Sequence, residues 1–142
     1  GNTLSGMGSN IGNQIMGGLQ AYQANQNYQN YMKQQGIAHG AAISIVLTDP
    51  RTTSYKELLA RAGFVVDHAV EVKEPLKLGH IDPQKVAIAQ IKAHPLLAYG
   101  KTYSVLLDYC KKQNMKLQLP TVEIFDHSVL RVEMPLEGKA GA

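Results

Sequence analysis

The spacing of apolar residues divides the chain into two parts. From Gly1 to Gln35, apolar side chains recur every three or four positions, the spacing of one face of a helix. The residues of this stripe, with the two glycines of a Gly-x-x-x-Gly pair inside it, are Leu4, Met7, Gly8, Ile11, Gly12, Ile15, Leu19 and Tyr22. Each glycine inside a helix costs up to about 1 kcal/mol relative to alanine. The pattern predicts a helix that persists only when it packs against another surface.

The stretch from Ala21 to Gln35 continues without glycine and places tyrosines among amides instead of charges. Uncharged amides can hydrogen-bond across a crowded interface without the desolvation cost of a bare charge. We therefore predict that residues 1–40 form a helical or extended assembly segment that packs in an oligomer, a channel or a membrane. A flexible Gly/Asn/Gln linker is the alternative that composition leaves open.

After Gly40 the pattern changes to that of a small α/β domain. A run rich in β-branched residues predicts a buried strand over 42–47. Ser54 is placed to cap a helix over 54–62, which Gly63 would end. Alternating polar and apolar residues then predict a strand over 64–72. Strand, helix and strand in this order fit a parallel βαβ unit, and the short second connection leaves an antiparallel pairing open.

The C-terminal half carries further start and turn signals. Asp82-Pro83 predicts an N-cap and first position of a helix over 82–93, with His94-Pro95 at its end. A second helix is predicted over 103–113. Strands over 121–125 and 128–134 are predicted to form a hairpin, with Asp126-His127 as its turn.

The predicted fold class is α/β, with α+β left open. One mixed-sheet domain over 41–137 ends in a β-hairpin, and a tail follows over 138–142. Charge supports the division at residue 40, because Lys33 is the one charged side chain before Val46. The net charge of +3 is mild, and basic residues are interleaved with acidic ones. Candidate contacts for nucleic acid are four lysines that a helix and the loop after it could present together: Lys101, Lys111, Lys112 and Lys116.

The sequence contains no common nucleotide-binding or hydrolase motif, which predicts a non-enzymatic protein without cofactor or metal. The single cysteine, Cys110, falls on the apolar side of its predicted helix and is interpreted as a buried thiol. Asp67 and His68 would point to opposite faces of a strand and could not serve one site. His80 and Asp82 flank the predicted helix start, where a helix cap is the interpretation.

The glycine-rich amphipathic start followed by the Gln/Asn/Tyr-rich stretch resembles the N-termini of internal virion, pilot and ejection proteins of tailed phages and small icosahedral viruses. The resemblance covers residues 1–35, is compositional, and implies a segment that lines or penetrates a membrane during genome delivery. The first five residues, Gly1-Asn2-Thr3-Leu4-Ser5, are also similar to an N-myristoylation signal with Gly1 as the lipidated residue. The rest of the chain resembles no known family.

The predicted function is therefore that of a structural component of a multi-subunit assembly, in particular a virion. Its predicted partners are copies of itself and other subunits, with a membrane as a further candidate. The alternative is a soluble binding module for nucleic acid or a small ligand, with the N-terminal part as a tether. No apolar run is long enough to span a membrane, and there is no secretory signal, so we expect a virion or intracellular assembly.

Overall fold

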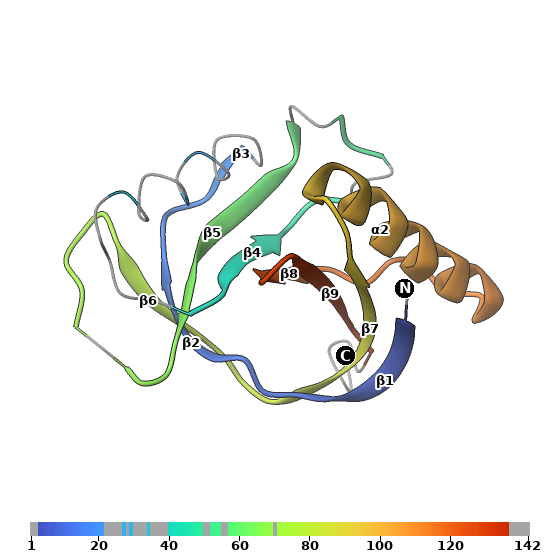
Figure 1. Cartoon of the computed structure of the whole chain (residues 1–142), viewed down its shortest axis with the longest axis horizontal. Helices are drawn as coiled ribbons and strands as arrows, with labels where there is room; N and C mark the ends of the chain where they lie inside the picture. Colours follow the sequence, from blue (N-terminus) through green and yellow to red (C-terminus); the bar gives the residue numbers. More distant parts are fainter. Residues whose placement is uncertain are drawn as a thin grey trace.

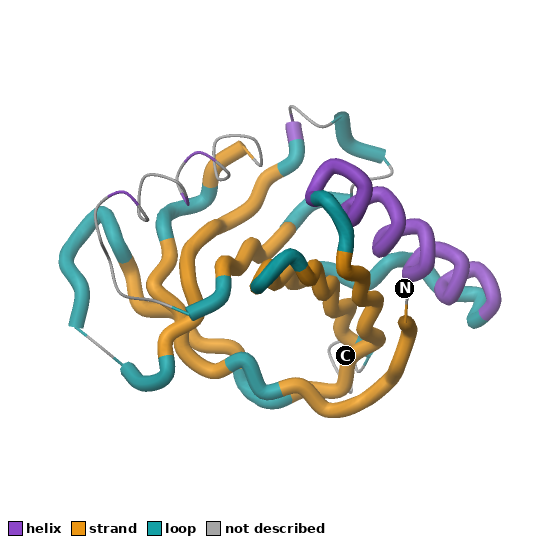
Figure 2. Tube along the Cα trace, viewed as in Figure 1, coloured by secondary structure: helices purple, strands orange, loops and turns teal. Residues whose placement is uncertain are grey.

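The computed structural model describes residues 3–21, 27, 29, 34, 40–49, 52–54, 57–69 and 71–136. They form a mixed fold dominated by one antiparallel sheet, with one long helix on it (Figures 1 and 2). The elements are β1 Thr3–Ser9, β2 Gly12–Met16, β3 Gln20–Ala21, β4 Ala42–Val46, β5 Leu59–Val66, β6 Lys77–Ile81, β7 Gln84–Lys92, α2 Pro95–Lys112, β8 Thr121–Asp126 and β9 Val129–Pro135. The strand order in the sheet is β1-β7-β9-β8-β4-β5-β2-β6, and β3 pairs with β5.

A long two-stranded ribbon closes this sheet. β1 runs into β2 and β6 runs into β7, each pair separated by only two residues. β1 pairs antiparallel with β7, from Thr3 opposite Gln90, and β2 pairs with β6, to Met16 opposite Lys77. The other edge of β2 pairs with β5, and the other edge of β7 pairs with β9. Figure 1 shows the ribbon curving round the sheet and joining strands at its two ends.

The sheet consists of two units with the same pairing order. In the first unit β5 lies between β2 and β4, and in the second β9 lies between β7 and β8. The units meet where β4 pairs antiparallel with β8. The centre of this pairing is Ser44 opposite Glu123, so the strands are related by an approximate two-fold axis at that pair.

Helix α2 packs on β7 and β9. Pro95 occupies the first helical position, and the carbonyl of His94 accepts hydrogen bonds of 2.9 Å from the amides of Leu97 and Ala98. Apolar residues from the helix and both strands form the main core: Ala87, Ala89, Ile91, Ala98, Leu106, Cys110, Leu117, Leu130, Val132 and Met134. Cys110 is buried, as predicted, and its Sγ lies 3.5 Å from Met134 Sδ.

The predicted N-terminal helix is wrong over residues 3–21, which form β1, β2 and β3. Backbone pairing with β5, β6 and β7 supplies the partners that a glycine-interrupted helix would lack. Gly12, the first residue of β2, has a φ of 75°, a conformation that favours glycine. The boundary predicted at residue 40 therefore divides a sheet that has strands on both sides of it. The prediction for residues 22–35 falls outside the described residues, except at Asn27, Gln29 and Gln34.

Two predicted helices are strands instead. Where a helix over 54–62 was predicted, the Ser54 carbonyl accepts hydrogen bonds from the amides of Glu57 and Leu58, and β5 begins at Leu59. The segment predicted as a helix over 82–93 is β7. β7 is paired on both edges and covered on both faces, so its β-branched residues show no simple alternation. The parallel βαβ interpretation is likewise wrong, because β4 and β5 pair antiparallel.

Three predictions are confirmed in position. The strand over 42–47 is β4, and the helix over 103–113 is the second half of α2, which begins earlier than predicted. The C-terminal hairpin is present as β8 and β9. Its two-residue turn is His127-Ser128, one position later than predicted, and both residues have positive φ, at 50° and 66°. This conformation matches the twist of the flanking strands.

Gly63 allows β2 and β5 to approach each other. A Cβ at this position would lie 1.8 Å from the carbonyl oxygen of Ile15. We predict that Gly63→Ala lowers the free energy of unfolding by about 3 kcal/mol or more, because β2 has to move. Gly18→Ala is the control, since nothing lies within 4 Å of a Cβ there. Urea unfolding of both variants measures the difference, and equal stability of the two would contradict the close approach.

Candidate ligand-binding cavity

The two faces of the sheet have different environments. On one face, Leu130, Val132 and Met134 of β9 contact the core under α2. On the opposite face, which we call the inner face, Ile43 and Val122 pack with Met16 and Ile124. Residues paired across strands share a face, which also assigns Ile45, Arg131 and Glu133 to the inner face.

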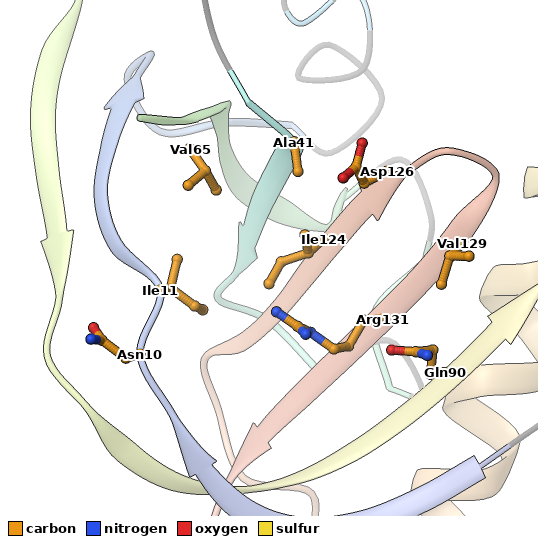
Figure 3. A pocket seen from close by; sticks show the side chains of 9 residues that line it. All are labelled: Asn10, Ile11, Ala41, Val65, Gln90, Ile124, Asp126, Val129 and Arg131. Carbon is orange, nitrogen blue, oxygen red and sulfur yellow. The ribbon is translucent and has the colours of Figure 1, made fainter. Parts of the chain in front are cut away.

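A cavity of about 340 Å³, which we call the first cavity, lies on the inner face. Its apolar lining comes from Ile11, Ala41, Val65, Ile124 and Val129. Its polar lining comes from Asn10, Gln90, Asp126 and Arg131. Figure 3 shows the side chain of Arg131 reaching from β9 across the cavity toward Ile11. A cavity of this size, lined about equally by apolar and polar groups, has room for a small molecule.

Arg131 forms an ion pair with the buried carboxylate of Glu133. Its Nε lies 2.9 Å from Oε2 of Glu133, whose side chain is 1% exposed, whereas the side chain of Arg131 is 39% exposed. The contact is an ion pair without hydrogen-bond geometry, because neither Nε nor either carboxylate oxygen has a hydrogen-bond partner among the described residues. Glu133 does not line the first cavity, so a molecule there would meet the guanidinium and not the carboxylate.

The buried groups without hydrogen-bond partners all lie on the inner face. Within the described part of the chain these atoms are Gln14 Oε1, Arg131 Nε, Glu133 Oε1 and Glu133 Oε2. Gln14 belongs to this face because it is paired with Val65, which lines the first cavity. Its amide nitrogen donates to the carbonyl of Gly12, so only the oxygen is left. Buried polar atoms are nearly always satisfied, so this group of atoms sets the inner face apart from the core under α2.

A second buried carboxylate, Glu123, lies under α2 and has a structural role. The hydroxyl of Tyr103 donates to Glu123 Oε2 at 2.7 Å and lies 2.7 Å from Thr121 Oγ1. Burial, and then the negative charge of Glu123, raise the pKa of the Tyr103 hydroxyl well above its usual 10.0. Tyr103 therefore stays protonated and fixes the helix to β8.

We predict that Tyr103→Phe destabilises the protein by about 1–3 kcal/mol, because it removes a hydrogen bond to a buried carboxylate. The raised pKa means that the folded state holds the Tyr103 proton more tightly than the unfolded state. This contribution is complete below pH 10 and is lost as the pH rises through the folded-state pKa. The cost of the substitution should thus shrink at alkaline pH. Urea unfolding between neutral pH and about pH 11 tests this, with Tyr109→Phe on the same helix as control; a pH-independent cost would contradict it.

The structure does not bring the predicted packing residues together on one stripe. Ile11 lines the first cavity, whereas Ile15 is buried against Phe64 and Leu19 is 50% exposed. Three others, Leu4, Met7 and Gly8, lie on β1, and Gly12 begins β2. Gly1 and Tyr22 fall outside the described residues.

The predicted nucleic-acid contacts are all exposed. Lys101, Lys111 and Lys112 lie on α2, and Lys116 lies in the loop after it. The last two helical lysines sit where they offset the negative end of the helix dipole. Exposure is necessary for contact with nucleic acid but is also the ordinary state of a surface lysine.

The acid–histidine pairs differ from their predicted arrangement. β5 ends at Val66, so Asp67 and His68 lie beyond it, and the two side chains contact each other at an exposed position. No helix follows Asp82; its Oδ1 lies 3.2 Å from His80 Nε2 beside the ribbon. Among the described residues no group of three His, Cys, Asp or Glu side chains could hold a metal ion. In the same part of the chain, no helix is both long and apolar enough to cross a membrane.

Sequence reasoning missed Arg131 and Glu133 as site residues. Their alternation with Leu130 and Val132 was predictable, but it suggested a hairpin with one face in water. The signal available was a basic and an acidic residue two positions apart on one face of a strand. Because β9 lies inside the closed sheet, that face is the inner one and Glu133 is buried.

No protein-family model matches the chain, and no curated protein matches it. Among solved structures, the chain is similar to one in a cryo-EM structure of an EcmrR–DNA complex in EcmrR-RPo. The TM-score is 0.68 at 9% sequence identity, and the likeness covers 95% of the present chain. The present chain spans 58% of the length of that chain. At this identity the likeness concerns the fold.

Proposed function

We propose that the chain is a binding module that holds a small molecule in the first cavity without chemical conversion. The observation that carries this proposal is Arg131, which lines the first cavity and whose buried Nε has no hydrogen-bond partner among the described residues. A ligand that accepts hydrogen bonds from this guanidinium would offset part of the cost of burying it.

The lining defines the kind of ligand. Five apolar residues favour a mainly apolar body, and Arg131 and Gln90 offer donors at one side. Beyond its Nε, the guanidinium has further N–H groups for the oxygen of a carbonyl, amide or acid. Because Glu133 already neutralises Arg131, the guanidinium is expected to act as a hydrogen-bond donor rather than as an unpaired charge, and Asp126 is the other charged group of the lining. The ligand is therefore expected to be apolar with at least one oxygen acceptor.

A cavity-filling pair of variants tests this proposal. We expect Ile124→Trp to fill part of the first cavity, whereas Ile45→Trp changes the other end of the inner face. In a screen of small-molecule fragments by amide NMR, hits that shift Gln90 and Arg131 should lose at least about tenfold in affinity in Ile124→Trp only. Arg131→Gln should weaken the hits that carry an oxygen acceptor. The proposal would be refuted if no fragment binds, or if the affinity of the hits is unchanged in both Ile124→Trp and Arg131→Gln.

Contact with nucleic acid is a second candidate, favoured by one observation: the similar solved structure is a complex with DNA. The candidate surface is the exposed one that carries Lys101, Lys111, Lys112 and Lys116. Lys111→Glu with Lys112→Glu should weaken binding to a DNA duplex and flatten its salt dependence. Fluorescence anisotropy measures both, with Lys85→Glu on β7 as a control away from the helix.

The assembly role, with a virion as its setting, stays a prediction. Because β1 and β2 belong to the sheet, a packing surface would have to coexist with their pairing, rather than being a detachable segment. Light scattering of the intact chain, with and without lipid vesicles, distinguishes a large or vesicle-bound complex from a small soluble protein.

A further inference from the structure

The wall of the first cavity that β8 and β9 form contains two neighbouring cross-strand pairs. Ile124 is opposite Arg131, and Asp126 is opposite Val129. All four residues line the cavity, so the acid and the base occupy diagonal corners of this wall and the two apolar side chains occupy the others. Diagonal neighbours of an antiparallel pair lie about 7–8 Å apart. The cavity therefore offers a small molecule an acceptor and a donor on one partly apolar wall.

Asp126 and Arg131 do not neutralise each other. Within the described part of the chain no ion pair joins them, and Figure 3 shows the two charged groups apart from each other. Nε of Arg131 faces Glu133, and Oδ1 of Asp126 lies 3.0 Å from Nδ1 of His127. Neither Glu133 nor His127 is among the described residues that line the first cavity. The other N–H groups of the guanidinium and the remaining lone pairs of the carboxylate are thus left for a ligand.

The fold itself does not require a carboxylate opposite Val129. A second cavity of about 280 Å³ lies at the other end of the inner face, where Ile45 is the counterpart of Ile124 about the approximate two-fold axis. The counterpart of Asp126 is Leu47, because each lies three residues beyond the pair at the axis. No carboxylate is among the described residues that line the second cavity. The acid is therefore particular to the first cavity and is not part of the architecture that the two units share.

We propose that the ligand of the first cavity carries an amino group and a carbonyl oxygen on one apolar body. The amino group donates to the carboxylate of Asp126, and the carbonyl oxygen accepts from the guanidinium of Arg131. The body packs against Ile124 and Val129. Hydrogen bonds with a charged donor or acceptor are stronger than those between neutral groups. This inference rests on the function proposed above and adds a second polar group to the ligand described there.

Three probes that share a phenyl ring separate the two contacts. Phenylalaninamide has both the amino group and the carbonyl, phenethylamine lacks the carbonyl, and 3-phenylpropanamide lacks the amino group. They are titrated into the full chain at about pH 6.5, where both amines are protonated, and followed through the amide NMR signals of Gln90 and Arg131. Phenylalaninamide should bind at least about fivefold more tightly than either of the other two, because it makes both contacts.

Single variants should affect the probes selectively. Asp126→Asn should weaken phenylalaninamide and phenethylamine about fivefold, the effect of a partly exposed ion pair, and leave 3-phenylpropanamide unchanged. Arg131→Gln should weaken phenylalaninamide and 3-phenylpropanamide about tenfold and leave phenethylamine unchanged. Asp67→Asn is the matched control, since Asp67 also contacts a neighbouring histidine but does not line the cavity. It should change the affinity of no probe.

The cavity-filling pair locates the probes, because Ile124→Trp should weaken all three and Ile45→Trp none. An Asp126→Asn variant that binds phenethylamine as tightly as the unmodified chain would overturn the inference. So would an absence of phenylalaninamide binding at about 5 mM, which detects even millimolar affinity. The function proposed above falls as well only if the fragment screen also yields no hit. The side chain of Asp126 is 57% exposed, so the result for Asp126→Asn stands even where another variant fails to fold.

Discussion

The pairing of residues 3–16 with residues 77–90 is the interaction on which the rest of the structure depends. The two segments lie far apart in the sequence, and their pairing brings both units of the sheet into one closed arrangement. With this pairing, β7 has a partner on each edge, β1 and β9, and β2 likewise lies between β5 and β6. Without it, the inner face would be one side of an open sheet, and its polar side chains would be in water.

The closure of the sheet determines whether the polar side chains of the inner face are buried or in water. Arg131 and Glu133 have the alternation of a solvent-facing hairpin, yet the carboxylate is buried and its pairing to the guanidinium lacks hydrogen-bond geometry. A buried ion pair seldom adds stability in proportion to its attraction, because both ions lose hydration. The ion pair of Arg131 and Glu133 is therefore not expected to be a main source of stability.

The sequence patterns predicted those helices and strands whose conformation is determined by residues close by in the sequence. The β-branched run at Ala42, the end of α2 and the hairpin before Val129 were all visible in the sequence, because their determinants lie within a few residues. β1, β2 and β7 were not, since their conformation is fixed by distant partners that override helical spacing and a capping signal at Asp82.

The candidate site was beyond sequence reasoning for the same reason. Arg131 and Gln90 become neighbours of Ile11 only through the ribbon, and nothing in their own segments distinguishes them from surface residues. The predicted stripe from Leu4 to Tyr22 contributes one member, Ile11, to the cavity. Cys110 was interpreted correctly because a thiol on the apolar side of a helix needs no knowledge of distant strands.

The approximate two-fold axis has an evolutionary consequence. Two identical copies of one unit, assembled as a symmetric dimer, would have to present the same side chains at every equivalent position. Once the units are fused in one chain, as by tandem duplication of a gene, each position can diverge from its counterpart. Glu133 and Gly63 occupy equivalent positions in the two units and differ in this way, so a change at one position does not force the same change at the other.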